Sequence, residues 1–95
     1  MTLEKVVEKQ AVKYALGKGV VGLKLDTKRG WPDRLFIGYK KIWFVEFKRP
    51  GKKPRPKQHA VHRELARLGY PVSVVDTVSQ FCSEFEIAFS DSPSA

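Results

Sequence analysis

Three side chains in the middle of the chain have the types and spacing for phosphate-ester chemistry. Asp33 follows a proline, and Glu46 and Lys48 lie two residues apart in the apolar stretch "FVEFK". Two carboxylates held close together repel each other, so a divalent cation between them is expected. Mg²⁺ suits such oxygen ligands and also binds substrate phosphate. The metal would neutralise charge building on phosphorus and lower the pKa of an attacking water, which Lys48 would hold and polarise.

A β-hairpin would bring these side chains together. Residues 33–38 and 42–48 read as strands, and antiparallel pairing around "YKK" would place Asp33 opposite Glu46. Opposed residues in such a pair have Cβ atoms roughly 4.5–5.5 Å apart. "YKK" is not a strong turn sequence such as Asn-Gly, and a slip of one residue would separate the two acids. Without that pairing, the same residues would be a solvated ion pair and an ordinary turn aspartate.

The first helix could add another acid. Residues 2–17 carry apolar side chains at spacings of three and four, with Thr2 placed as an N-cap. Glu8 lies beside the apolar side and is the preferred additional ligand. Glu4 is the alternative, although its charge suits the helix dipole without a further role. Both acids could instead face solvent and pair with neighbouring lysines.

A second helix is expected over residues 57–68. Gln58 begins it and could donate to a metal-bound water or a phosphate, or simply lie at the surface. His59 and His62 are three residues apart on this helix. We expect them to contact phosphate or to lie at the surface, because nothing else in the sequence resembles a zinc ligand.

Between the hairpin and this helix, the segment 49–57 is strongly basic. It contains three prolines, so it cannot be the interior of a strand or helix. Its cations could bind DNA phosphates, although charge runs are more often solvated loops. Further contacts are expected from residues flanking Asp33. The predicted DNA-binding residues are Arg29, Trp31, Arg34, Arg49, Lys52, Lys53, Arg55, Lys57 and His59.

Composition indicates one intracellular globular domain. The 95 residues suffice for a single domain, and the net charge of +8 favours nucleic acid as partner, ahead of an acidic membrane surface. No apolar run approaches the ~20 residues that span a bilayer, and the N-terminus has no signal core. Cys82 is the single cysteine, which excludes an internal disulfide; we expect a small buried side chain.

The remaining segments complete the order α-β-β-β-α-β-α. Residues 20–26 and 70–76 read as strands, and 77–89 as a last amphipathic helix. One domain over 1–89 is expected, followed by a disordered tail over 90–95.

The stretch "RGWPD" followed by "FVEFKRPGKKPRPKQ" resembles the VRR-Nuc (virus-type replication-repair nuclease) family of the PD-(D/E)xK superfamily. The resemblance implies a restriction-endonuclease-like α/β core with a mixed four-stranded sheet flanked by helices. It also implies Mg²⁺- or Mn²⁺-dependent hydrolysis of DNA. By position, Asp33, Glu46 and the Phe47 main-chain carbonyl match metal ligands, and Lys48 matches the catalytic lysine. Glu8 matches the helix acid, acting through a metal-bound water or a second ion, and Gln58 matches the family's glutamine.

The resulting hypothesis is a homodimeric endonuclease that resolves Holliday junctions, in the cytoplasm of a prokaryotic or virus-infected host cell. A twofold dimer would present two sites to two symmetrical strands. The alternatives are a nuclease for flaps, plain duplex or RNA, a nucleic-acid-binding module without turnover, and an inactive partner subunit. A binding module would not explain acids at the foot of a basic loop, because acids repel phosphate unless a cation is present.

Overall fold

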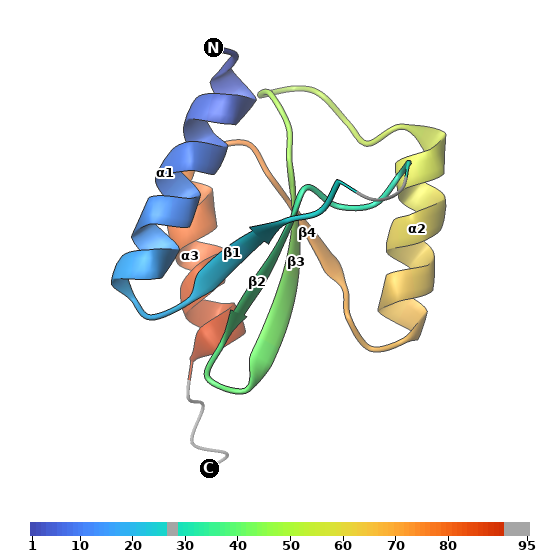
Figure 1. Cartoon of the computed structure of the whole chain (residues 1–95). Helices are drawn as coiled ribbons and strands as arrows, with labels where there is room; N and C mark the ends of the chain where they lie inside the picture. The colour runs from blue at the N-terminus through green and yellow to red at the C-terminus, as the bar shows by residue number, and fades with distance from the viewer. Residues whose placement is uncertain (27–28, 91–95) are drawn as a thin grey trace.

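The computed structural model describes residues 1–26 and 29–90. Its elements follow the order expected from the sequence (Figure 1). They are α1 (Leu3–Gly17), β1 (Val21–Lys24), β2 (Arg34–Gly38), β3 (Lys41–Phe47), α2 (Pro56–Arg67), β4 (Val72–Val75) and α3 (Val78–Phe89). The expected tail lies outside the described residues, apart from Ser90.

The four strands form one mixed sheet in the order β1-β2-β3-β4. β1, β2 and β3 are antiparallel neighbours, whereas β3 and β4 run parallel. Leu35 pairs with Phe44, so the predicted hairpin register is confirmed. Tyr39 and Lys40 turn the hairpin with φ of 50° and 61°, the left-handed values that a tight two-residue turn needs. The Tyr39 hydroxyl donates to the Lys18 carbonyl, a contact outside the hairpin that helps to hold this unfavourable turn sequence.

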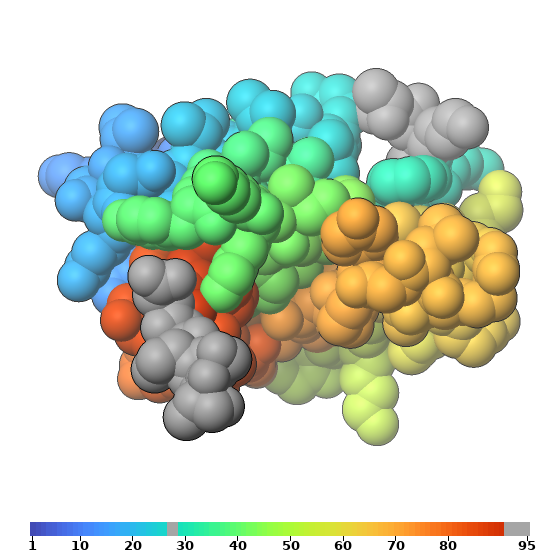
Figure 2. Space-filling model, turned by 90° about the horizontal axis from the view of Figure 1, so that it is seen from below, coloured from blue at the N-terminus to red at the C-terminus, as the bar shows by residue number. Residues whose placement is uncertain are grey.

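Helices cover the sheet on two faces. α1 and α3 lie together on one face, and α2 lies on the other beside β4 (Figure 1). Figure 2 shows the same division from below, with the yellow-orange α2 on one side of the green hairpin and the red α3 on the other. The Thr2 hydroxyl caps α1 by accepting from the Lys5 N–H, as the sequence predicted.

The main core lies between the sheet and the α1–α3 face. Phe36 on β2 and Trp43 on β3 each have ring centroids 5.2 Å from the ring of Phe81 on α3. Such aromatic pairs add about 0.5–1.5 kcal/mol each beyond the area that they bury. Trp43 is therefore a core residue, as expected, and it helps to fix β3, the strand that carries Glu46.

Two strand lengths and the burial of one side chain differ from the expectations. β1 and β4 are shorter than the predicted strands; β4 starts at Val72 because Pro71 has no N–H to donate to a ladder. Cys82 is half-buried rather than buried. In the described part of the chain, no helix is long and apolar enough to cross a membrane.

Candidate active site

Asp33 and Glu46 meet at the open end of the β2–β3 hairpin. Asp33 Oδ2 accepts a hydrogen bond of 2.8 Å from the Phe47 N–H, which turns the carboxylate toward β3. Glu46 is almost fully buried on β3. Burial, and then the charge of Asp33, raise the pKa of Glu46 to about 7. The hairpin thus builds a carboxylate pair in which one member resists ionisation.

Lys48 continues the strand on the same side as Glu46. Its Nζ lies 3.6 Å from Glu46 Oε2, and its charge partly opposes the rise in the pKa of Glu46. The Lys48 N–H donates to the Val75 carbonyl on β4, which fixes the backbone at this point. The side chain is half-buried, so its ammonium is held at the site rather than free in solvent.

Gln58 connects the start of α2 to the acid pair. Its Nε2 donates to Glu46 Oε2 over 3.0 Å, and its Oε1 accepts from the Arg55 N–H over 2.8 Å. These two hydrogen bonds fix which end of the amide faces the carboxylate. Gln58 therefore orients Glu46 and also closes the first turn of α2.

His62 also faces Glu46, so the plain surface role weighed for it is wrong, whereas the predicted phosphate contact stays a prediction. Its side chain is 13% exposed, and Nε2 lies 3.8 Å from Glu46 Oε1. Within residues 1–26 and 29–90, neither of these two buried atoms has a hydrogen-bond partner. Burial lowers the pKa of His62, which favours the neutral imidazole. The spacing of four residues from Gln58 was the signal in the sequence, because it puts both side chains on one helix face.

Glu8 and Arg34 are placed together as an ion pair. Arg34 Nε donates to Glu8 Oε2 over 2.7 Å, and Lys5 Nζ lies 3.4 Å from the other oxygen. Arg34 is the first residue of β2 and pairs with Val45, whereas Asp33 lies just before the strand. The charge of Glu8, and to a smaller extent that of Asp33, raises the pKa of Lys5. The roles predicted for Glu8 and Arg34 remain predictions.

Glu4, the alternative helix acid, lies beside the basic segment that follows Lys48. Its Oε2 is 3.9 Å from Arg49 Nε, and Glu4 and Lys48 line the same shallow cavity of about 330 Å³. Lys52 and Lys53 line this cavity as well. Of the two helix acids weighed from the sequence, Glu4 is thus the one that shares a cavity with Lys48.

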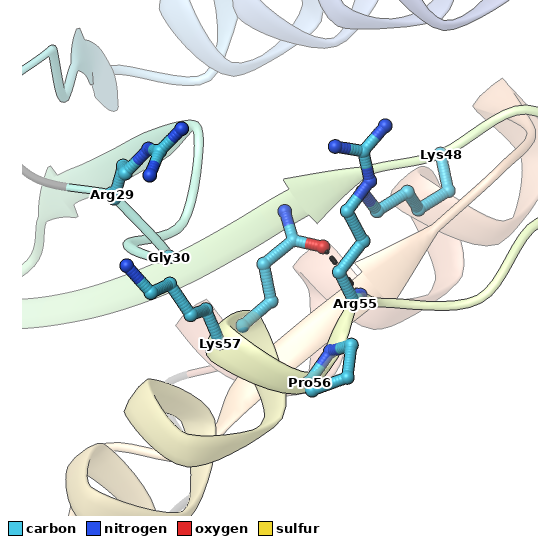
Figure 3. A pocket seen from close by; sticks show the side chains of 7 residues that line it. Arg29, Gly30, Lys48, Arg55, Pro56 and Lys57 are labelled. Atoms are coloured by element: carbon cyan, nitrogen blue, oxygen red, sulfur yellow. Dashed lines mark hydrogen bonds between the residues drawn. The ribbon is translucent and has the colours of Figure 1, made fainter.

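A basic pocket of about 440 Å³ opens at the N-terminus of α2. Figure 3 shows Arg29, Lys48, Arg55 and Lys57 surrounding it. The first turn of α2 has no acidic residue, and helix N-termini favour anions. Four of the cations chosen from the sequence therefore line one pocket beside the acid pair.

Gly30 explains how the Arg29 segment reaches this pocket. Its φ is 86°, and a Cβ built there would lie 2.8 Å from the Lys57 carbonyl oxygen. A side chain would thus push the segment away from α2. The glycine in "RGWPD" is required for this close packing.

The other residues predicted to bind DNA lie outside the pocket. Trp31 is half-buried and packs edge-on against Phe44, with ring centroids 6.2 Å apart. His59 is exposed on α2. Trp31 thus has a packing role, whatever contact it makes with DNA.

The donor set fits a hard divalent cation held by two carboxylates. In the described residues, no group of three or more His, Cys, Asp or Glu side chains is arranged to hold a metal. Asp33 and Glu46, with the Phe47 carbonyl, would supply oxygen ligands, and Mg²⁺ commonly takes one or two carboxylates with water and phosphate. The raised pKa of Glu46 and its unpaired Oε1 are the features that a cation would relieve.

Comparisons with known proteins found a similar protein and a similar solved structure. The chain is 40% identical over 77 residues to "Putative nuclease p44" of Acyrthosiphon pisum secondary endosymbiont phage 1, covering 78% of this chain and 83% of that protein. A solved structure described as "VRR_NUC domain" superimposes with a TM-score of 0.79 and 31% identity, over 90% of this chain and 97% of that one. No model of a known protein family matches the chain.

The sheet order, together with the similarity to a VRR_NUC domain and to a putative nuclease, identifies an α/β nuclease domain. The chain belongs to the VRR-Nuc family. The resemblance seen in "RGWPD" and "FVEFK" is thereby confirmed, as is the fold that it implied.

Proposed function

We propose that this nuclease is a divalent-metal-dependent endonuclease that acts as a homodimer on branched DNA, with four-way junctions as its preferred substrate. The observation that carries the proposal is the carboxylate pair of Asp33 and Glu46, with Lys48 beside it and a basic pocket at its edge. Acids at the centre of a phosphate-binding surface are unfavourable unless a cation joins them.

Different residues of the chain would have different roles in phosphodiester hydrolysis. Asp33, Glu46 and the Phe47 carbonyl would hold Mg²⁺ or Mn²⁺, which when bound supplies positive charge to the developing negative charge on phosphate oxygens. Lys48 would orient and polarise the attacking water. Gln58 keeps Glu46 in place through its 3.0 Å hydrogen bond. Catalysis by this arrangement would come mainly from positioning and electrostatics.

The basic pocket would bind the DNA backbone next to the cleaved bond. Phosphate contacts position a protein on DNA but carry little sequence information. The pocket-lining cations Arg29, Arg55 and Lys57 are suited to this task, because they surround the N-terminus of α2. A substrate recognised by shape, such as a branch point, is consistent with such contacts.

An exposed apolar surface supports the homodimer. Val21, Ile37 and Ile42 lie opposite one another on β1, β2 and β3, and all three are exposed. Leu23 adds to the same surface two residues along β1. Uncharged side chains on a chain of net charge +8 are poorly suited to phosphate but well suited to a second copy.

A cleavage assay tests this function directly. Purified protein would be incubated with labelled four-way, flap, duplex and single-stranded DNA in Mg²⁺, Mn²⁺ or EDTA. We expect the junction to be cut fastest, no cutting in EDTA, and none by Glu46→Ala in any metal. Cleavage that persists in EDTA would refute the metal-dependent mechanism. DNA binding without cleavage in either metal would favour a binding module instead.

A further inference from the structure

His62 and Glu46 face each other at the centre of the site at a distance too long for a hydrogen bond. Glu46 Oε2 accepts from Gln58, but Oε1 has no partner in the described residues and points at His62 Nε2, 3.8 Å away. Nε2 is likewise buried and unpaired there. Buried polar groups in native proteins are rarely left unsatisfied, so a donor and an acceptor that face each other indicate a hydrogen bond.

The chemistry of the two groups determines which of them donates. A neutral imidazole carries one N–H, and the ring nitrogen that carries it is set by the available acceptor. Burial lowers the pKa of His62, with His59 and Lys48 adding to the effect. An ionised carboxylate has no proton to donate, so the His62 nitrogen that faces Oε1 of Glu46 must carry the N–H. A short side-chain rotation would close the distance.

We propose that His62 is a positioning residue for the metal site: its Nε2–H donates to Oε1 of Glu46 and, together with Gln58, fixes the plane of that carboxylate. Both side chains come from one face of α2, four residues apart. With the Gln58 hydrogen bond to Oε2 alone, the carboxylate group could still rotate. A second hydrogen bond, from His62 to Oε1, would prevent this rotation before a cation binds. The proposal rests on the proposed metal-dependent function.

Such outer contacts affect metal affinity measurably. Removing a hydrogen-bond partner of a metal ligand typically weakens metal binding about 10–100-fold. We expect this loss for His62→Leu, which keeps a side chain of similar bulk but has no donor. His62→Gln retains an N–H near the position of Nε2, so it should recover most of the affinity. Arg63→Gln is the matched control, because Arg63 is exposed on the same helix.

Two measurements test the proposal. The first titrates Mn²⁺ into wild type and the three variants, following free Mn²⁺ by electron paramagnetic resonance, with circular dichroism to confirm folding. The second records the imidazole ¹H–¹⁵N signals of the metal-free protein at pH 8, where Glu46 is ionised. We expect His62 as the Nε2–H tautomer, with that proton slow to exchange in wild type and fast in Glu46→Ala.

The outcomes separate the inference from the function on which it rests. If wild type binds Mn²⁺ and His62→Leu binds it equally well, the inference about His62 is wrong while the metal site stands. An Nδ1–H tautomer, or an Nε2–H signal unchanged in Glu46→Ala, would also overturn it. If wild type binds no Mn²⁺, the metal-dependent function and the positioning role fail together. A loss of Mn²⁺ affinity of about 10–100-fold in His62→Leu, with recovery in His62→Gln, supports the positioning role of His62.

Discussion

Glu8 on α1 and Arg34 on β2 form a largely buried ion pair, with Arg34 Nε 2.7 Å from Glu8 Oε2. Arg34 also donates to the Gly22 carbonyl on β1 over 3.0 Å, so one guanidinium ties together a helix and two strands. Breaking such a pair leaves the remaining charge buried without compensation. The contact therefore matters for stability, independently of any catalytic role for Glu8.

Replacing Glu8 with Gln should lower the free energy of unfolding by about 2 kcal/mol, because Arg34 would keep its charge without its partner. Urea denaturation measures this loss. Glu64→Gln is the control, since Glu64 pairs with Arg67 in an exposed ion pair, which contributes little to stability. A double mutant with Arg34→Gln should lose less than the sum of the two single changes. Additive losses would show that the pair does not act as a unit.

Lys48→Ala should lower kcat for junction cleavage by about 10²–10³-fold, because no other group would polarise the attacking water. DNA affinity should fall much less, since several other cations surround the pocket. Single-turnover kinetics and a binding titration separate the two effects. Lys13→Ala removes the same charge from the exposed side of α1 and should cut normally. A Lys48 variant that cuts as fast as wild type would rule out this role.

The raised pKa of Glu46 predicts a pH-dependent stability in EDTA. The folded state binds this proton more tightly, with a pKa of about 7 against 4.5 when unfolded. The resulting stabilisation is complete below pH 4.5 and is lost as the pH rises through 7. Wild type should therefore lose about 2 kcal/mol between pH 5 and pH 8 beyond any change in Glu46→Gln. Urea denaturation of both proteins at the two pH values measures the difference, and parallel changes would contradict it.

The basic pocket predicts the salt dependence of DNA binding. Each phosphate contact contributes about −0.9 to the slope of log K against log salt for duplex DNA. Arg55→Ala and Lys57→Ala should each make this slope less steep by about 0.9, the contribution of one phosphate contact. Fluorescence anisotropy over a range of NaCl concentrations measures this. Lys13→Ala should leave the slope nearly unchanged, and an equal effect from Lys13 would mean that only net charge matters.

The exposed apolar surface predicts where the dimer forms. Ile37→Glu places a charge at the centre of the row formed by Val21, Ile37 and Ile42, and two copies would then repel each other. Light scattering should show a dimer for wild type and a monomer for this variant. Ile87→Glu is the control, because Ile87 is 76% exposed on α3, away from this surface. A wild-type monomer at micromolar concentration would contradict the homodimer.

The hairpin and its register could be predicted because they depend on local pattern. Alternation of apolar residues and a two-residue turn leave few ways to pair Leu35 with Phe44, and the acid pair follows from that pairing. The turn itself was less certain, because Tyr39 is held by Lys18, a contact distant in sequence.

Contacts between elements were beyond the reach of the sequence. Glu8 and Arg34 are 26 residues apart, and their pairing depends on the angle at which α1 packs on the sheet. The inward orientation of His62 depends in the same way on where α2 packs against β3 and β4 after the parallel crossover. Helical periodicity shows which residues of α2 share a face, but it does not show which element that face packs against.

The division of the sheet into two faces has a practical consequence for engineering. The aromatic cluster around Phe81 lies on the α3 side, whereas Glu46, Gln58 and His62 belong to the α2 side. Changes in residues that share no partners usually have additive effects. Phe47 is the exception, because its ring packs on Phe81 while its N–H donates to Asp33. Thermostabilising substitutions elsewhere in the aromatic cluster could therefore be combined with substrate-altering substitutions near α2.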